Sequence, residues 1–431
     1  MGNGYLMIFA LLLGCLASTM PVFMALFFTG TIGLVFMVGI DPQIVIEVLY
    51  RSMDKFALVV VMFFVLCGNI MTKGSIVEKL IKTANILVGF LPGGLAMAGV
   101  LACGFFGAIS GSTVATVVAI GGFMIPALIE NNYDEKFSVG VMTTAPILGV
   151  IIPPSIAMIL YAMVSNDQLE ALFLTGFIPG LIIIIAMSIY SWFVCRKMGM
   201  TRKKRPTLAE TFAILKESFW ALFLPVLIFG GIYSGLFTAN EAAVVACFYA
   251  FFVEIVIHKD MKVRDIKNVV VSSAITSATL LVIVAGASVF GEYLTFEQIP
   301  GKIATVVVDN ISSPWVFLLS VNLLLLFIGM FMDIISATLI LTPIFLPLLS
   351  KFGIDTMHFG LLMTINLGIG YCTPPLGVSL YITGATVDRN IVYVSRAVMP
   401  FLLIQIAILL LLTFWPDIVL LLPKLVYGYG Q

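Results

Sequence analysis

Long runs of apolar residues, separated by short polar breaks, dominate this sequence. Residues 83–129 contain no Asp, Glu, Lys or Arg, and residues 310–350 contain only one. A helix crosses a bilayer with about 20 apolar residues, whereas a transmembrane β-barrel would show short alternating strands. We therefore expect an all-α polytopic membrane protein. The pattern predicts helical segments at 5–20, 22–39, 55–72, 84–92, 94–129, 137–165, 170–195, 219–235, 240–257, 269–293, 315–350, 359–386 and 392–415.

Two of these segments, 94–129 and 315–350, are too long for one crossing and are interrupted by small or polar residues. They are expected to be re-entrant helical hairpins. A threading that places the basic loops in the cytoplasm starts the first hairpin from the cytoplasmic side and the second from the other side. Each half of the chain then holds five crossings, three before its hairpin and two after it.

The two halves of the chain are related in sequence. A shift of 221 residues places Pro126 on Pro347, Gly149 on Gly370, and the pair Pro153–Pro154 on Pro374–Pro375. Five crossings in each half invert the second copy, and inverted repeats are typical of secondary transporters with a site near the membrane midplane. We expect an N-terminal repeat at 1–200, a cytoplasmic connector at 201–218 and an inverted C-terminal repeat at 219–431.

Each predicted repeat contains two interruptions inside apolar sequence. The hairpins turn near Gly107–Thr113 and Gly329–Asp333, and double prolines break the spans 137–165 and 359–386. Proline removes an amide donor and frees carbonyl groups, and such groups survive in a bilayer only where protein or water covers them. Segments 73–92 and 295–312 precede the hairpins and are expected to be interfacial arm helices, or alternatively plain loops.

Freed carbonyls attract cations, and helix N-termini attract anions. We expect two or more sodium ions to bind where each hairpin tip meets its broken span, on either side of an anionic substrate. The candidate sodium ligands are Ser110, Gly149, Val150, Ile152, Pro153, Asp333, Gly370, Tyr371 and Thr373. The candidate substrate ligands are Ser112, Thr113, Ser155, Ser336 and Thr338. The alternative for Ser110, Ser112 and Thr113 is that small polar residues ease close helix contact.

Asp333 is the only charged residue between Asp309 and Lys351, and it is the one acid expected inside an apolar core. An ionised group at the membrane centre is costly and is functional by default. It is expected to bind a cation or to order the second hairpin tip, with a helix N-cap as the alternative. His258 and His358 lie outside the apolar runs and are expected on the surface.

The motifs Gly107–Ser112, Ile151–Ser155, Gly329–Asp333 and Thr373–Gly377 resemble the large membrane subunit of tripartite ATP-independent periplasmic (TRAP) transporters, the DctM-like family. The resemblance implies an elevator-type transporter in the bacterial inner membrane that imports an organic acid, such as a C4-dicarboxylate or sialic acid, with sodium. It also implies two partner proteins, a small four-helix membrane subunit and a periplasmic substrate-binding protein.

Three other functions are left open by the residues. A stand-alone cation-coupled carrier would need no binding protein, and a channel would give rapid, uncoupled flux. An intramembrane enzyme would need a buried nucleophile, acid pair or metal cluster, and no such set stands out, so we expect no enzyme activity. The formal net charge is zero, which gives no indication of a nucleic-acid partner.

Overall fold

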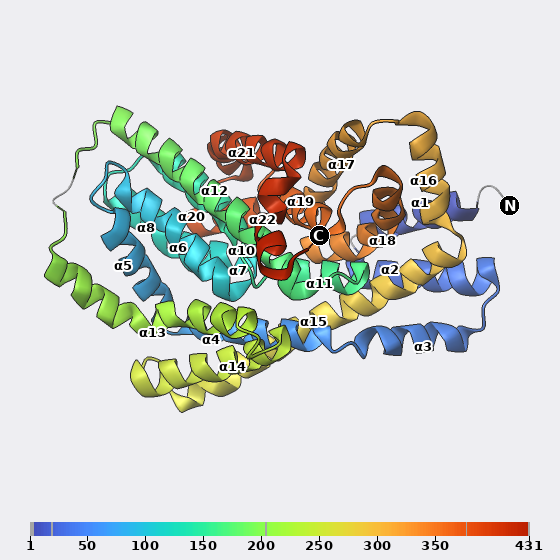
Figure 1. The fold of residues 1–431 in the computed structure, drawn as a ribbon, viewed down its shortest axis with the longest axis horizontal. Helices are drawn as coiled ribbons and strands as arrows, with labels where there is room; N and C mark the ends of the chain where they lie inside the picture. Colours follow the sequence, from blue (N-terminus) through green and yellow to red (C-terminus); the bar gives the residue numbers. More distant parts are fainter. Residues whose placement is uncertain (1–3, 19, 203–204, 376, 430–431) are drawn as a thin grey trace.

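The structure, a computed structural model, describes residues 4–18, 20–202, 205–375 and 377–429. These residues form helices and connecting turns, with no strand among them (Figure 1). The N-terminal half contains α1 Gly4–Ala17, α2 Val22–Ile32 with the π-helical η1 Gly33–Val38, α3 Pro42–Met53, α4 Ala57–Lys73, α5 Ile76–Val88, α6 Gly94–Ser110, α7 Thr113–Thr116, η2 Val117–Gly121, α8 Gly122–Glu130, α9 Glu135–Thr144, η3 Ala145–Ile147, α10 Leu148–Ile151, α11 Ile156–Ser165 and α12 Leu169–Lys197.

The C-terminal half repeats this order of elements. It contains α13 Leu208–Tyr233, α14 Ala239–Phe252 with the π-helical η4 Val253–Ile257, α15 Val263–Phe296, α16 Ile299–Asn310, α17 Pro314–Gly329, α18 Ile334–Phe352, α19 Thr356–Gly370, α20 Val378–Val387, α21 Ile391–Phe414 and α22 Pro416–Tyr427. In both halves, outer helices lead to a short arm helix (α5 or α16), a hairpin (α6–α8 or α17–α18), a broken span (α9–α11 or α19–α20) and a closing helix (α12 or α21). Both predicted hairpins and both predicted breaks are confirmed.

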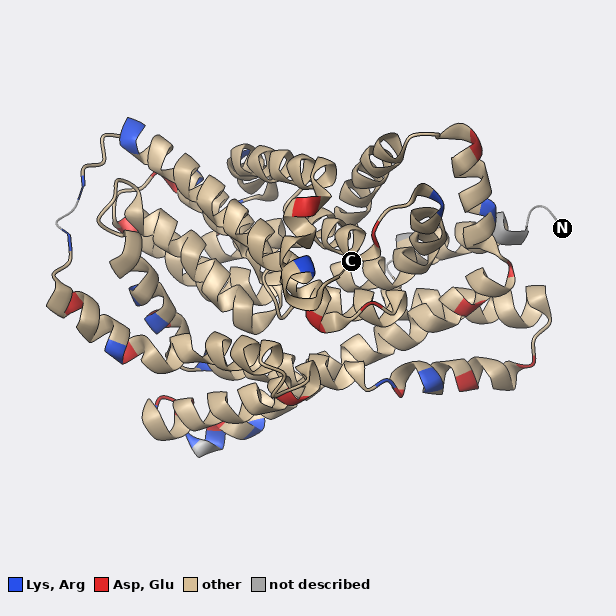
Figure 2. Ribbon diagram, in the orientation of Figure 1, with Lys and Arg blue, Asp and Glu red and all other residues tan. Residues whose placement is uncertain are grey.

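Charged residues lie mainly near the ends of the helices, so long uncharged stretches run between them (Figure 2). Among the described residues, eight helices are long and apolar enough to cross a membrane, or nine if the bent pair α3–α4 is one span. This number includes one arm of each hairpin, Thr113–Glu130 and Ile334–Phe352. The composition of the helices thus agrees with a multi-pass membrane protein.

The helices differ from the sequence predictions in several places, and the helix predicted at 84–92 is α5 Ile76–Val88, which begins eight residues earlier. The pattern did not predict α3 and α22, which are short, amphipathic, and begin with a proline that favours the first helical turn. α13 begins at Leu208 rather than at 219, because Thr207 and Glu210 form a capping box with each other's backbone amides. Part of the predicted connector at 201–218 therefore belongs to α13.

Segments 73–92 and 295–312 contain helices, α5 and α16, so the alternative of plain loops is wrong. α5 packs against α6 of the first hairpin and against α13, while α16 packs against α18 of the second hairpin (Figure 1). Each arm helix therefore contacts the hairpin that follows it in its own repeat. Their role as links to a moving unit stays a prediction.

The two broken spans are tied together at both ends. Arg389, which follows α20, makes a double ion pair with Glu135 at the start of α9, with Nε–Oε1 and Nη2–Oε2 distances of 2.7 and 3.0 Å. Asp167, which follows α11, accepts a 2.7 Å hydrogen bond from the hydroxyl of Thr356 at the start of α19. The end of each broken span is thus bonded to the beginning of the other. The two spans run antiparallel, as inverted repeats require.

A buried amide network holds the second hairpin against the second broken span. Asn366 of α19 donates to the amide oxygen of Asn322 of α17 at 2.8 Å, and Asn322 donates to Thr413 of α21 at 2.9 Å. Both amide side chains are buried. Polar side chains of this kind join helices within a membrane.

Asn322→Leu is expected to lower the free energy of unfolding by about 1 to 2 kcal/mol, because the Asn366 amide loses one of its two acceptors and keeps only the carbonyl of Leu362. Equilibrium unfolding in mixed micelles measures this difference. The double variant Asn322→Leu/Asn366→Leu should recover part of the loss, since replacing both partners removes the amide that has lost an acceptor. A single variant as stable as the wild type would contradict a stabilising role for the network.

Candidate functional site

Each broken span is interrupted where its double proline lies. α10 ends at Ile151, and Ser155 caps α11 by accepting the amide of Met158 at 3.4 Å. α19 ends at Gly370, and its continuation α20 begins at Val378. The peptide bonds Pro153–Pro154 and Pro374–Pro375 are both cis. The residues between the half-helices leave backbone groups outside helical hydrogen bonding, inside the protein.

The first hairpin tip packs tightly on the first break. A β-carbon at Gly107 would lie 2.8 Å from the carbonyl oxygen of Leu148 and 2.9 Å from the Cα of Gly149. Gly111, in the left-handed conformation with φ +61°, accepts a 3.4 Å hydrogen bond from the amide of Ile156. Glycine permits this close approach and favours this backbone conformation. The tip is therefore seated directly on the break.

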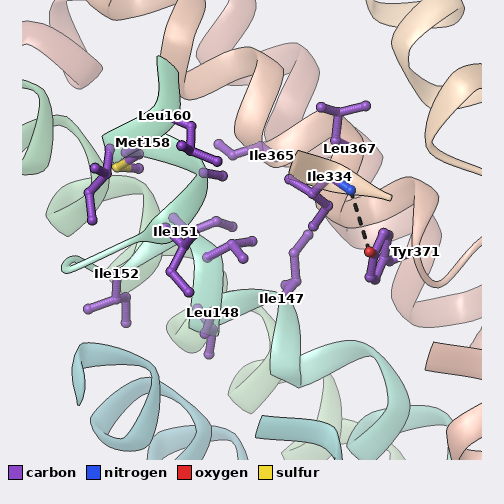
Figure 3. Close-up of a cluster of buried hydrophobic side chains, with 14 of the residues drawn as sticks. Ile147, Leu148, Ile151, Ile152, Met158, Leu160, Ile334, Ile365, Leu367 and Tyr371 are labelled. Carbon is purple, nitrogen blue, oxygen red and sulfur yellow. Dashed lines mark hydrogen bonds between the residues drawn. The ribbon is translucent and has the colours of Figure 1, made fainter. Parts of the chain in front are cut away.

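The second hairpin repeats this contact with different atoms. A β-carbon at Gly370 would lie 2.6 Å from the Cα of Gly329, so the two backbones touch. The amide of Ile334, the first residue of α18, donates to the hydroxyl of Tyr371 at 3.4 Å. Figure 3 shows this bond beside buried apolar side chains of the first broken span, among them Ile147 and Ile151. The two breaks therefore share one apolar surrounding.

Both tips and both breaks border one cavity of about 100 Å³. Its lining residues are Gly111, Ser112, Thr113, Val114, Val150, Ile156, Ala157, Ile334, Ile335 and Tyr371. Thr113, Ile156 and Ile334 are the first residues of α7, α11 and α18. Because the N-terminal end of a helix carries partial positive charge, the cavity favours a negatively charged group although no charged residue lines it.

Oxygen atoms suited to a cation gather at both breaks. A β-carbon at Gly149 would lie 2.6 Å from the hydroxyl oxygen of Thr116 and 2.7 Å from the carbonyl oxygen of Ser112. At Gly377 it would lie 2.7 Å from the carbonyl oxygen of Tyr371 and 2.9 Å from that of Thr373. Carbonyl and hydroxyl oxygens at broken helices are the ligands that coupling ions use, so these residues are the candidates to hold the predicted sodium ions.

Three buried hydroxyl oxygens near the tips and the second break have no hydrogen-bond partner in the described protein: Thr113 Oγ1, Ser336 Oγ and Ser379 Oγ. An unpaired buried polar group costs free energy, and a bound ligand could supply the missing partner. The sequence predicted Thr113 and Ser336 as substrate ligands but did not single out Ser379 or Thr116. Thr116 follows the predicted first hairpin tip and Ser379 follows the predicted second break, each within one or two helical turns. A hydroxyl residue at such a position is the sequence signal that could have identified them.

Other predicted site residues already have partners within the protein. The hydroxyl of Ser110 lies 3.3 Å from that of Thr116, Ser112 accepts the amide of Ala115 at 3.4 Å, and Thr338 and Thr373 each donate to a carbonyl in their own helix at 2.7 and 2.8 Å. Gly149, Val150, Ile152, Pro153, Gly370 and Tyr371 all lie at the two breaks. The structure thus brings the predicted residues together but does not assign each one a ligand.

Asp333 caps α18, accepting the amide of Ser336 at 2.9 Å, so the N-cap alternative is confirmed. The residue is half-buried and does not line the cavity. The prediction that Asp333 is the one acid in an apolar core is wrong, because Glu254 of η4 is fully buried. The local sequence pattern does not indicate burial of Glu254, because this residue stands at the end of an apolar run, beside the basic loop that begins at His258.

The prediction that His258 and His358 are surface residues is also wrong. Only 5 % of the His258 side chain is exposed, and His358 is buried with its Nε2 2.9 Å from the carbonyl oxygen of Leu412. Each histidine follows or precedes an apolar run, and a helix far away in sequence covers it. Burial of this kind is not visible in the local pattern.

Comparison with known proteins agrees with this arrangement. Residues 9–418 match the tripartite ATP-independent periplasmic transporter, DctM component, family. The chain is 38 % identical over 434 residues to the C4-dicarboxylate TRAP transporter large permease protein DctM of Rhodobacter capsulatus, covering 97 % of this chain and 99 % of that protein. It is 36 % identical to the sialic acid TRAP transporter large permease protein SiaM of Vibrio cholerae, covering 97 % and 98 % of the two chains.

The crystal structure of the Alcanivorax borkumensis YdaH transporter has the same fold, with a TM-score of 0.64 at 13 % identity, covering 90 % of this chain and 89 % of that chain. This likeness agrees with the predicted all-helical membrane fold. The long family match and the identity to large permease proteins together lead to one conclusion: this chain belongs to the DctM family, the large membrane component of tripartite ATP-independent periplasmic transporters.

Proposed function

We propose that this protein imports a small organic acid anion across the bacterial inner membrane, driven by sodium. A periplasmic binding protein delivers the anion, and a separate small membrane subunit completes the membrane complex. The relatives support this proposal, since their names specify C4-dicarboxylates and sialic acid, both of which are carboxylates. Because those relatives are permeases, we propose transport rather than catalysis.

The cavity between the two hairpin tips is the observation that carries the proposal. The helix N-termini that begin at Ile156 and Ile334 face one uncharged cavity, and carbonyl and hydroxyl oxygens gather at the breaks beside it. A carboxylate would bind at the helix N-termini, while sodium ions would bind the oxygens of the breaks. Thr113 and Ser336 then direct their unpaired hydroxyls to the bound ligands.

The proposed transport uses an elevator motion, and the contacts between the two halves support it. The ties Glu135–Arg389 and Asp167–Thr356 hold the two broken spans together, so they move as one body with both hairpins. The cavity of about 100 Å³ is smaller than the roughly 300–1,000 Å³ of usual ligand pockets. Loading the substrate therefore requires one hairpin tip to move off its break.

Uptake by proteoliposomes is expected to require a sodium gradient. The experiment reconstitutes this chain with the small membrane subunit and the binding protein encoded in neighbouring reading frames, and it follows radiolabelled succinate and sialic acid. A sodium gradient should raise the initial rate by at least about tenfold over potassium, because only an ion bound together with the substrate couples the two fluxes.

Two outcomes would contradict the proposal. Equal uptake in sodium and in potassium would show that transport is not coupled to sodium. Full uptake without the binding protein would indicate a stand-alone carrier. Rapid flux that does not saturate with substrate would indicate a channel.

A further inference from the structure

A buried carboxylate caps the N-terminal end of the first arm helix, α5. Glu254, in the π-helical segment η4 that ends α14, has no exposed surface. Its two carboxylate oxygens each accept one backbone amide, Oε2 from Ser75 and Oε1 from Ile76, both at 3.3 Å. These amides belong to the start of α5, where the backbone N–H groups have no acceptor within the helix. The carboxylate therefore takes the place of a side-chain N-cap.

The surroundings are shaped to hold this carboxylate. Gly74 precedes α5, and a β-carbon there would overlap the carboxylate of Glu254. The ammonium group of Lys79, one turn into α5, donates to the hydroxyl of Ser75 at 2.8 Å. Nδ1 of His258 lies 3.8 Å from Oε2 of Glu254 and 3.4 Å from the same serine hydroxyl. A glycine, a cation and a polar network thus accommodate a charge that would otherwise be costly to bury.

The second arm helix lacks this arrangement. α16 follows Gln298, which has a φ of +52°, and no side chain bonds to its first turn. The matching π-helical segment of the first repeat, Gly33–Val38, contains no ionisable residue, and Gly33 lies against the ring of Tyr293. Tyr293 belongs to α15, so this contact does not reach the start of α16. Among the described residues, the carboxylate contact at the start of α5 therefore has no counterpart at the second arm helix.

The other end of α5 is a glycine-rich joint. Gly89 ends the helix, and Gly93, with φ +75°, precedes α6. Beyond the joint, the amide of Leu95 donates to the hydroxyl of Tyr133 at 3.3 Å, which fixes the start of the hairpin to its own repeat. Between the two fixed points, residues 89–93 are not helical and contain two glycines, a residue type that permits more backbone conformations than others.

We propose that Glu254 is a positioning residue that fixes the beginning of arm helix α5 to α14, so that the first hairpin moves about the joint at 89–93. This inference rests on the proposed transport function. The carboxylate acts through the amides of Ser75 and Ile76 and does not touch the substrate. The beginning of the arm helix is thereby fixed to α14, and the chain bends at the end of the arm helix.

A metal ion is the other occupant that this cluster suggests. Possible ligand atoms of Glu254, His258 and Asp260 lie within 4.8 Å of one another. Both oxygens of Glu254 already accept amides, however, and Lys79 supplies a positive charge beside them. We therefore assign the carboxylate to the helix terminus.

Hydrogen–deuterium exchange tests the attachment without transport. In the purified protein, Glu254→Ala should speed exchange of peptides covering residues 74–80 by about tenfold or more, because two amides lose their acceptor. Glu254→Gln keeps one carbonyl oxygen and should give an intermediate rate. Glu47→Gln, an exposed change on α3, is the control and should exchange as the wild type does.

Uptake kinetics test the positioning role. With succinate or sialic acid, whichever the wild type transports, Glu254→Ala should lower Vmax by about tenfold with KM unchanged, since the site itself is intact. Glu254→Gln should restore part of the rate. Gly74→Ala should resemble Glu254→Ala, and the double variant should be no slower than either single variant, because the added methyl then fills the vacated space.

The possible failures are distinguishable. Wild-type exchange and Vmax in Glu254→Ala, or a changed KM at constant Vmax, would overturn the inference. Faster exchange at residues 74–80 after treatment with EDTA would also overturn it, in favour of a metal site. If the wild type itself shows no sodium-driven uptake, the proposed function fails, while the exchange result still decides whether Glu254 holds the arm.

Discussion

Asp333→Ala is expected to abolish sodium-driven uptake while the protein still inserts into the membrane. The variant loses two things, the cap of α18, worth about 1 kcal/mol, and a negative charge at the hairpin tip. α18 begins at the cavity with Ile334, so a shift of its first turn displaces the lining of the site. Initial rates in proteoliposomes measure the loss, and size-exclusion chromatography confirms insertion and folding.

Asp333→Asn separates the charge from the cap, because an asparagine at this position caps a helix about as well as an aspartate. If the carboxylate takes part in sodium binding, the Asn variant should need a higher sodium concentration for half-maximal uptake. Full uptake by the Ala variant would refute any functional role for Asp333. Normal sodium dependence in the Asn variant would show that Asp333 acts only as the N-cap of α18.

Gly370→Ala is expected to lower both stability and transport. The new methyl carbon would lie 2.6 Å from the backbone of Gly329, and a backbone cannot turn aside as a flexible side chain can. Such overpacking costs about 1–3 kcal/mol or more, and it pushes the second hairpin tip away from its break. Uptake should fall by at least about tenfold, a change that corresponds to about 1.4 kcal/mol.

Gly230→Ala in α13 is the matched control, because nothing lies within 4 Å of the added methyl. Alanine is a better helix former than glycine by about 1 kcal/mol, so this variant should unfold at the same temperature as the wild type or at a higher one. Thermal unfolding and uptake are measured on both variants. A Gly370→Ala protein that matches Gly230→Ala in both would show that the contact between the two backbones is dispensable.

The features that the sequence predicted well are those that glycine, proline and missing charge mark directly. The tips at Gly107–Thr113 and Gly329–Asp333 and the double-proline breaks stand out because each interrupts a long apolar run. The pairing of each tip with its own break followed from the repeat. Local backbone chemistry was sufficient for both predictions.

Features that depend on distant contacts could not be predicted in this way. Glu254 is buried because Gly74 and the first turn of α5 surround it, about 180 residues away in the sequence. His358 is covered by the end of α21 at Leu412. α3 and α22 are too short and too polar on one face to resemble spans, so a search for apolar runs passes over them.

The ties between the broken spans have a consequence for synthesis of the protein. Asp167 precedes its partner Thr356 by 189 residues, and Glu135 precedes Arg389 by 254. The N-terminal half therefore emerges from the ribosome and enters the membrane before either partner exists. Its proline-broken span, with exposed carbonyl groups, has to be sheltered until the second half arrives. A chain that stops before Thr356 therefore lacks both partners of the first broken span.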